Sequence, residues 1–264
     1  MQSFQFSNAK NVAEAKAAAA SGAKILAGGQ SLLPSMRLGL AAPDALASLG
    51  AIADLKGITV AGGVVKIGAM TTHATVAASA EVRAAIPALA DLANHIGDRQ
   101  VRNRGTIGGS LANNDPAACY PAAVLGLGAT VHTDRRDIAA DDFFVGLYTT
   151  ALAEDEIITA VSFPVPEKAG WQKFKQPASR FSIVGVFTSK GLSSAGGGVR
   201  VAVTGAGANG VFRATALEAR LAAGWSAAAL AGATVDPAGL NSDMHGSAEY
   251  RAALIPVLAA RALG

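Results

Sequence analysis

Two glycine-rich segments hold the residue types with the clearest chemical use in this chain of 264 residues. The first is Ala27-Gly28-Gly29-Gln30-Ser31, and the second is Thr106-Ile107-Gly108-Gly109-Ser110. Adjacent glycines permit tight turns, and they remove the side chains that would keep an anion away from backbone N–H groups. Each segment also carries a hydroxyl residue. Together they predict a ligand with two phosphates held from both sides, such as a dinucleotide pyrophosphate.

The alternative is that both segments are ordinary turns. The chain has 30 glycines, so adjacent pairs are expected by chance. Gly62-Gly63 and the run from Gly196 to Gly198 have the pattern of plain hairpin turns. On composition alone, both interpretations of the two segments stay open.

The elements that must position these segments divide into three predicted regions. Residues 1–57 form a small α+β unit, 58–166 a larger unit with a mixed sheet, and 167–264 a C-terminal domain of antiparallel strands and helices. The first glycine segment follows a predicted strand at 24–26 and precedes a helix or turn at 31–40. The chain is therefore predicted to be an α+β protein. Further predicted strands are 44–49, 58–61, 64–67, 129–133, 156–163, 181–188 and 199–203, and predicted helices are 11–20, 72–79, 82–93, 117–127, 141–145, 215–223, 226–231 and 249–262. Pro87 lies inside 82–93, so the alternative there is a new turn or helix that starts at this residue.

A third glycine motif matches a different nucleotide fingerprint. Gly205-Ala206-Gly207-Ala208-Asn209-Gly210 fits the G-x-G-x-x-G pattern of dinucleotide-binding units, which would suggest NAD. That unit needs parallel strands and an acidic residue about 20 positions further on. Glu218 comes too early, and the preceding strand is predicted to pair in an antiparallel hairpin. We therefore interpret this motif as a turn.

Composition excludes several classes of protein. Cys119 is the sole cysteine, so the chain forms no internal disulfide and no cysteine cluster for zinc or iron–sulfur, and the four histidines lack paired metal spacing. The net charge is +3, and its densest cluster, Arg99, Arg102 and Arg104, is not interleaved with aromatics, which disfavours nucleic-acid binding. No signal peptide or bilayer-length apolar run is visible, so we expect a cytoplasmic protein.

The context of the glycine segments resembles a known family. Residues 24–34 and 100–111 are similar to the first and second flavin loops of the FAD-binding medium subunit of molybdenum hydroxylases, a family that includes bacterial carbon monoxide dehydrogenase and the flavin portion of xanthine dehydrogenase. The run at 114–118 is also similar, and 175–180 resembles the segment that approaches the flavin ring. The resemblance covers nearly the whole chain, in order.

The resemblance implies a FAD site between the first two domains. Main-chain N–H groups of 27–31 and 106–110 would hold the pyrophosphate, with hydroxyls of Ser31, Thr106 and Ser110. Many relatives have an acidic residue at the position of Cys119, and Asp115 nearby could replace it. Lys175 matches a lysine near the pyrimidine edge, with a surface lysine as its alternative. Ile158 resembles an apolar residue near the ring, with core packing as its alternative. The resemblance places Arg180 and Phe181 in the mobile segment that covers the ring.

The implied function is electron transfer without substrate chemistry of its own. Asp115 and His95 are isolated, and no acid–base pair, metal site or nucleophilic triad is visible. The resemblance implies partners: an iron–sulfur subunit with [2Fe-2S] clusters and a molybdenum-cofactor large subunit, assembled as a dimer of heterotrimers. Electrons would pass from the iron–sulfur subunit to FAD and on to an external acceptor. Two alternatives remain: a self-contained FAD oxidase or reductase, and a degenerate module that binds partners without flavin.

Overall fold

The N-terminal unit is a three-stranded parallel sheet. The computed structural model describes residues 2–192 and 198–263. Strands pair in the order β1-β3-β2, and helix α1 begins where the Asn11 side chain accepts a hydrogen bond from the Glu14 N–H (2.8 Å). Strand β1 was missed by the sequence analysis because its side chains are all exposed and show no apolar alternation. The elements are β1 (Gln5–Asn8), α1 (Val12–Ala20), β2 (Lys24–Leu26), α2 (Leu32–Arg37), β3 (Ala45–Ser48) and the 3₁₀ turn η1 (Ala53–Leu55).

The second unit is an antiparallel five-stranded sheet with helices on one face. The strand order is β4-β5-β10-β6-β7, so the late strand β10 is inserted at the centre. A small hairpin, β8 with β9, lies outside this sheet. The elements are β4 (Ile58–Ala61), β5 (Val64–Gly68), α3 (His73–Ala78), α4 (Ala80–Ala85), α5 (Pro87–Asn94), α6 (Arg99–Arg104), α7 (Ile107–Asn113), α8 (Tyr120–Gly126), β6 (Thr130–Thr133), β7 (Asp137–Ala139), α9 (Ala140–Phe143), β8 (Phe144–Gly146), β9 (Thr149–Thr150) and β10 (Ile158–Pro164).

The C-terminal region is a four-stranded antiparallel sheet with helices packed on its outer face. Strands pair in the order β11-β12-β13-β14. The antiparallel pairing of β12 with β13 confirms the hairpin predicted before Gly205. The predicted turn at 193–198 lies almost entirely outside the described residues. The elements are β11 (Lys168–Lys175), β12 (Ser182–Lys190), β13 (Arg200–Thr204), β14 (Phe212–Arg213), α10 (Thr215–Ala223), η2 (Ala227–Leu230) and α11 (Ala248–Arg261).

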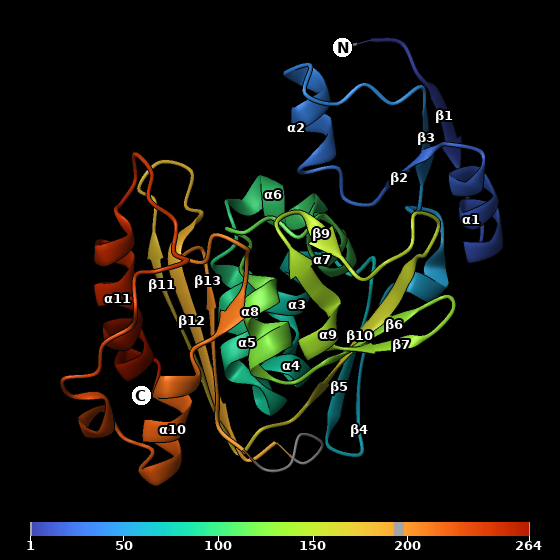
Figure 1. Ribbon diagram of the computed structural model, residues 1–264. Helices are drawn as coiled ribbons and strands as arrows, with labels where there is room; N and C mark the ends of the chain where they lie inside the picture. Colours follow the sequence, from blue (N-terminus) through green and yellow to red (C-terminus); the bar gives the residue numbers. More distant parts are fainter. Residues whose placement is uncertain (1, 193–197, 264) are drawn as a thin grey trace.

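Sheets and helices alternate in layers (Figure 1). Helices α5 and α8 lie between the five-stranded sheet and strands β11 to β13, while α11 covers the opposite face of β12. Strand β12 is buried along almost its whole length because helices pack on both of its faces. The main core therefore includes Trp171 and Phe187 of the C-terminal sheet together with apolar residues of the second unit. The α+β fold predicted from the sequence is confirmed.

Several predicted elements differ in detail. Residues 106–110 were predicted as a loop, but α7 begins at Ile107, because Thr106 caps it by accepting from the Gly109 N–H (3.2 Å). The region 82–93 is two helices, as the alternative with a new helix at Pro87 predicted, since Pro87 begins α5 and cannot donate a helical hydrogen bond. The division into domains at 57 and 166 stays a prediction, although each larger sheet lies within one predicted region.

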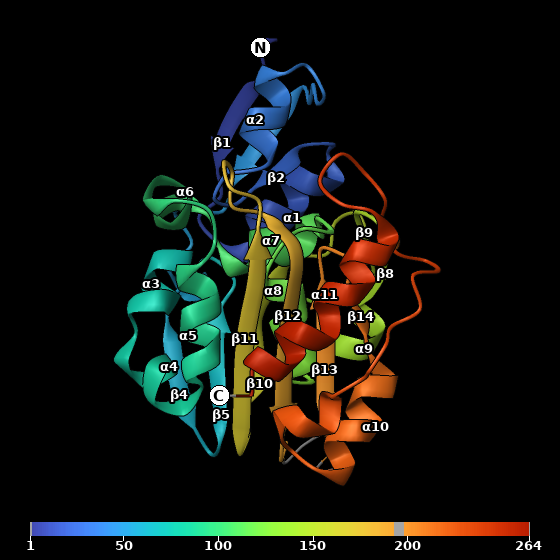
Figure 2. The same cartoon turned by 90° about the vertical axis from the view of Figure 1, so that its left-hand side faces the viewer.

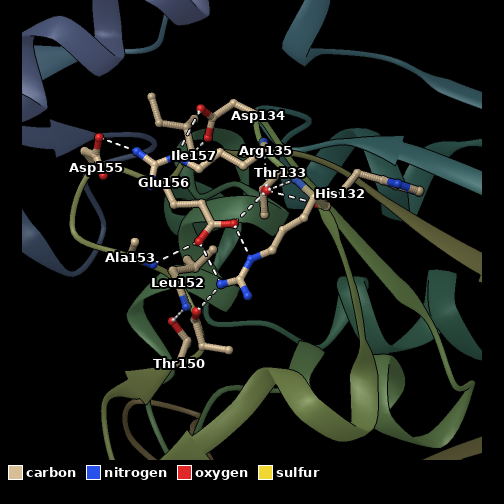
Figure 3. Close-up of polar contacts among 12 residues, drawn as sticks. His132, Thr133, Asp134, Arg135, Thr150, Leu152, Ala153, Asp155, Glu156 and Ile157 are labelled. Atoms are coloured by element: carbon tan, nitrogen blue, oxygen red, sulfur yellow. Dashed lines mark hydrogen bonds and ion pairs between the residues drawn. The ribbon is translucent and has the colours of Figure 1, made fainter.

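A polar network joins strand β6 to the segment before β10 (Figure 3). The Glu156 carboxylate accepts from Arg136 Nε (2.9 Å), Thr133 Oγ1 (2.8 Å) and the Ala153 N–H (3.0 Å). Hydrogen bonds led by that from Arg136 lower the pKa of Glu156 to about 2 despite burial. The carboxylate is thus held ionised, and it fixes the entry of the central strand.

One ion pair ties the N-terminal unit to the second unit. The Asp134 carboxylate accepts from Lys16 Nζ of α1 (2.8 Å) and from the Ile157 N–H (2.8 Å).

Within residues 2–192 and 198–263, no helix combines the length and apolar character needed to cross a bilayer.

Candidate functional site: two glycine segments in contact

The first glycine segment offers a run of free backbone donors. It connects β2 to α2, and Gly29 has φ of +72°, a conformation that favours glycine. Among the described residues, no acceptor is found for the backbone N–H groups of Ala27 to Leu32. The Ser31 side chain precedes α2 but makes no capping hydrogen bond. Successive free N–H groups on a partly exposed turn form a concavity suited to an anion.

The second glycine segment is built differently. Its N–H groups donate within the protein: Ile107 to Thr71 O (3.2 Å), Gly108 to Ala69 O (2.8 Å) and Ser110 to Thr106 O (3.0 Å). A methyl group on Gly108 would lie 2.6 Å from the Ala69 side chain, so this glycine permits close packing against the residue after β5. The part of this segment that a ligand could contact is the half-buried surface of Gly109 and Ser110.

The fold brings the two segments into direct contact. A methyl group on Gly109 would lie 3.1 Å from the Ala27 side chain, and one on Gly28 would collide with the carbonyl oxygen of Arg104. Both glycines are thus needed for the approach of β2 to the α6–α7 connection. The sequence analysis missed the backbone at Arg104 and Gly105 as one wall of the site, because a backbone contact leaves no residue-type signal.

The two residues predicted to lie along the flavin side chain, Cys119 and Asp115, have different contacts. Cys119 is 4% exposed, and its Sγ contacts Ser182 Oγ (3.5 Å) and Lys173 Nζ (3.3 Å). Asp115 accepts from the Ala117 N–H (2.8 Å), and after burial, the main cause, its charge also raises the pKa of Tyr148.

Lys173 and Lys175, two of the three lysines of β11, differ in their surroundings. Lys173 Nζ reaches both Cys119 and the His95 carbonyl oxygen (3.0 Å), whereas Lys175 is exposed and has no partner among the described residues. The strand register shifts between Phe174 and Lys175, so the lysines do not continue a regular alternation. The sequence analysis assigned no role to Lys173. The K-x-K spacing on one strand was the available signal.

Ile158 lies deeper than the other candidates. It is 5% exposed and belongs to the main core, on strand β10. The neighbouring Thr159 carbonyl accepts from the Ala69 N–H (2.9 Å), and the Ala69 carbonyl supports Gly108. Ile158 is thus buried in the core, and its strand is connected to the floor of the second glycine segment. Its place near the flavin ring stays a prediction.

Two histidines of this region, His73 and His95, have lowered pKa values, so both are neutral near pH 7 and neither adds positive charge. Burial, with a smaller effect of Arg102, lowers the pKa of His73 to about 4. His73 packs against Tyr120 and lies where a side chain on Gly105 would be. His95 also has a lowered pKa, chiefly through burial. Among the described residues, no group of three or more His, Cys, Asp or Glu side chains is arranged to hold a metal ion.

The comparisons with known proteins decide the family. Residues 2–166 match the family model described as the FAD binding domain in molybdopterin dehydrogenase. The chain belongs to this family. Its cofactor is therefore FAD, and the chain is a medium, FAD-binding subunit of an oxidoreductase of the molybdenum hydroxylase type. The free donors of 27–32 and the glycine contact with 104–109 fit a pyrophosphate group.

Similar proteins span nearly the whole chain. The nicotine 6-hydroxylase medium subunit of Paenarthrobacter nicotinovorans is 40% identical, over 91% of this chain and 88% of its own length. The carbon monoxide dehydrogenase medium chain of Hydrogenophaga pseudoflava is 34% identical, over 98% and 96%. A solved structure of carbon monoxide dehydrogenase from that organism, lacking the Mo-pyranopterin moiety of its cofactor, matches with a TM-score of 0.89 at 34% identity, over 99% of this chain and 96% of that one.

Proposed function

We propose that the FAD pyrophosphate is bound chiefly by the first glycine segment. Ala27, Gly28, Gly29, Gln30 and Ser31 supply backbone N–H groups, and Ser31 adds a free hydroxyl. The second segment, Thr106 to Ser110, supplies the opposing surface, with the Ser110 hydroxyl as its donor. The observation that carries this proposal is the contact between the segments at Gly109 and Ala27, with the run of unsatisfied donors beside it.

The flavin end of the site has its own set of residues. We propose that Asp115 and Cys119 lie along the flavin side chain, and that Lys175 presents its ammonium group to the pyrimidine edge. A cation there stabilises negative charge that develops on a reduced ring. Phe181 and Arg180 cover the ring, and Ile158 packs behind it. Lys173 holds Cys119 in place through its contact with Sγ.

The bound FAD supplies reversible electron acceptance, which no side chain of this protein can provide. We propose that this chain takes electrons from an iron–sulfur subunit with [2Fe-2S] clusters and passes them to an external acceptor. The substrate would be oxidised in a molybdenum-cofactor large subunit. The assembly would be a dimer of heterotrimers in the cytoplasm. Family membership and the match over 99% of the chain to a carbon monoxide dehydrogenase structure support this proposal.

Purification of the complex from its native source tests the proposal. We expect this chain to co-purify with two other subunits, with one FAD per chain by acid extraction and with iron, sulfide and molybdenum in the other subunits. A yellow, FAD-loaded chain that purifies alone and oxidises substrates would instead support a self-contained oxidase. A colourless chain would contradict the cofactor assignment.

A further inference from the structure

Three polar side chains form a connected chain of hydrogen bonds across strands β10, β6 and β7. The His132 Nδ1 atom lies 2.6 Å from the Asp137 carboxylate, and its Nε2 atom lies 2.7 Å from Ser162 Oγ. An ionised carboxylate only accepts hydrogen bonds, so in the neutral ring Nδ1 carries the proton and donates to Asp137. The Nε2 atom is then free to accept from the Ser162 hydroxyl. This is the connectivity of a serine, histidine and aspartate triad.

Strand pairing places the three side chains on one face of the five-stranded sheet. His132 is opposite Asp137 of β7, and Ser162 pairs with the β6 residue two positions before His132. Residues two positions apart on a strand share a face, whereas the intervening Val131 and Val161 are fully buried. In Figure 1 helices cover one side of this sheet, and Figure 2 shows α4 and α5 in front of β4 and β5. The triad lies on the opposite side.

The triad is accessible from solvent. The His132 side chain is 21% exposed and that of Asp137 66%, while Ser162 is half-buried. The η1 turn lies against one end of the same face, because a methyl group on Gly68, two positions from Lys66 on β5, would collide with the Leu55 carbonyl oxygen. The part of the face around Ser162 is left open. An open face of this kind suits a small acyl group.

A cation adjoins the serine. Lys66 of β5 is directly opposite Ser162 on the same face, and its side chain is exposed. Cβ atoms of such cross-strand neighbours lie about 5 Å apart, so the ammonium group can reach a carbonyl oxygen bound beside Ser162 Oγ. Strand β10 pairs on both sides, so the backbone N–H groups around Ser162 are used by the sheet. Lys66 is therefore the donor placed to stabilise an oxyanion.

We propose that Ser162, His132 and Asp137 form a second chemical site, at which small carboxylic esters acylate Ser162 and the acyl group is then hydrolysed. The site is separate from the FAD site, and it does not rest on the function proposed above. Ser162 Oγ bonds to the ester carbonyl carbon while its proton passes to His132 Nε2, and Lys66 faces the oxyanion. The bond from this carbon to the alcohol oxygen then breaks, and His132 returns the proton to the departing alcohol.

Water completes the reaction. One water molecule gives a proton to His132 Nε2 as its oxygen bonds to the acyl carbon. The bond to Ser162 Oγ breaks, and the proton passes from His132 to Ser162. Each ester and water thus give one alcohol and one carboxylic acid, and no oxidant or reductant takes part. Asp137 keeps the ring proton on Nδ1 and thereby orients the imidazole.

The sequence analysis found no triad because these residues form no local motif. Ser162 lies inside a regular strand and not in a G-x-S-x-G turn. His132 and Asp137 are five positions apart, and Ser162 follows 25 positions after Asp137. Only the antiparallel pairing of three strands brings the side chains together.

Reaction of the full chain with p-nitrophenyl acetate tests the proposal. Absorbance follows release of p-nitrophenolate, and a fluorophosphonate, which bonds stably to such a serine, locates the nucleophile by peptide mass spectrometry. We expect the label on Ser162, and acylation about 100-fold slower in Ser162→Ala and in His132→Gln. Thr59→Ala removes a hydroxyl from the same face, and His245→Gln removes an imidazole elsewhere. Both controls should react as the parent does.

Two exposed positions test the supporting roles with little risk to the fold. Lys66→Met should slow acylation about tenfold, because the oxyanion loses its cation. Lys168→Met, at an exposed lysine of β11, is the control and should react as the parent does. Asp137→Asn should also slow acylation about tenfold, less than for a buried aspartate, because water competes for its hydrogen bond.

Three results would overturn the proposal. They are absence of labelling in the folded parent, a label on residues other than Ser162, and labelling of Ser162 at the parent's rate in folded His132→Gln. Thermal unfolding shows which variants are folded. If His132→Gln does not fold, a parent-like rate in Lys66→Met and Asp137→Asn contradicts the site instead. No partner subunit or oxidation step enters this assay, so its failure leaves the proposed function untouched.

Discussion

At the scale of single residues, similar glycines have different tasks. Gly29 provides a backbone conformation with positive φ, Gly108 permits packing on Ala69, and Gly109 permits contact with Ala27. The sequence analysis assigned one anion-binding role to all of them. The hydrogen bonds instead leave free N–H donors only in the first of these two segments, because the N–H groups of the second donate to acceptors within the protein.

A comparison of two glycines tests the first segment. Gly29→Ala and Gly22→Ala both place alanine at positive φ, so each should lower the free energy of unfolding by about 1 kcal/mol. Only Gly29 lies among the free donors, and its added methyl would press on Leu33 at 2.9 Å. We expect Gly29→Ala to raise the dissociation constant for FAD at least tenfold, as measured by flavin fluorescence. Gly22→Ala should bind FAD as the parent does. Equal affinity in both variants would contradict the assignment.

At the scale of elements, short polar networks hold the strands that carry the site. Glu156 fixes the start of β10, and β10 in turn supports Ala69 beneath Gly108.

The motif from Gly205 to Gly210 is another element-scale feature. It follows an antiparallel strand, and the Gly205 N–H donates to the Pro116 carbonyl (2.8 Å), so the turn packs on the segment before α8.

The Glu156 network predicts a specific acid sensitivity. Because the folded state lowers its pKa to about 2 from 4.5, ionised Glu156 stabilises the protein fully above about pH 4.5 and progressively less as the pH falls toward 2. Glu156→Gln should lower the free energy of unfolding at pH 7 by about 2 kcal/mol, since it loses charged hydrogen bonds. It should also weaken the dependence of stability on pH in this window. Denaturant titrations measure both effects, and exposed Glu154→Gln is the control.

If the motif from Gly205 to Gly210 is only a turn, a substitution there should lower stability without changing nucleotide binding. Gly210→Ala places alanine at φ of +101°, so it should lower the free energy of unfolding by about 1 kcal/mol. The ratio of bound FAD to folded protein should stay unchanged, and so should any affinity for pyridine nucleotides. Specific loss of NAD binding by folded Gly210→Ala protein would restore the nucleotide interpretation.

At the scale of the whole molecule, the chain is the FAD-binding subunit of an oxidoreductase of the molybdenum hydroxylase type. Two sheets enclose one helical layer, and the glycine segments meet where the N-terminal unit approaches that layer. Among the described residues, the acid–base candidates of the sequence analysis are dispersed or occupied. Asp115 supports a turn, and His95 lies among cations. This arrangement suits a subunit that relays electrons.

The isolated chain should therefore not oxidise substrates. FAD-loaded protein is mixed anaerobically with an aldehyde, a purine or carbon monoxide, and the flavin absorbance is followed. We expect no rapid bleaching, whereas the complete complex should bleach with its own substrate. Slow reduction of dyes by the isolated chain is compatible with exposed flavin. Rapid bleaching without partners would refute the subunit assignment and favour a self-contained oxidase.

The sequence by itself determined the glycine segments, the α+β class and the family resemblance, because short motifs and apolar periodicity are local properties of the chain. It also predicted correctly that the strand before Gly205 pairs in an antiparallel hairpin. Only the tertiary structure decided that 106–110 begins a helix, that its donors are satisfied by Ala69 and Thr71, and that Lys173 reaches Cys119. These outcomes depend on which distant backbone groups come within hydrogen-bonding distance. Residue types do not encode that locally, since every residue carries the same amide and carbonyl groups.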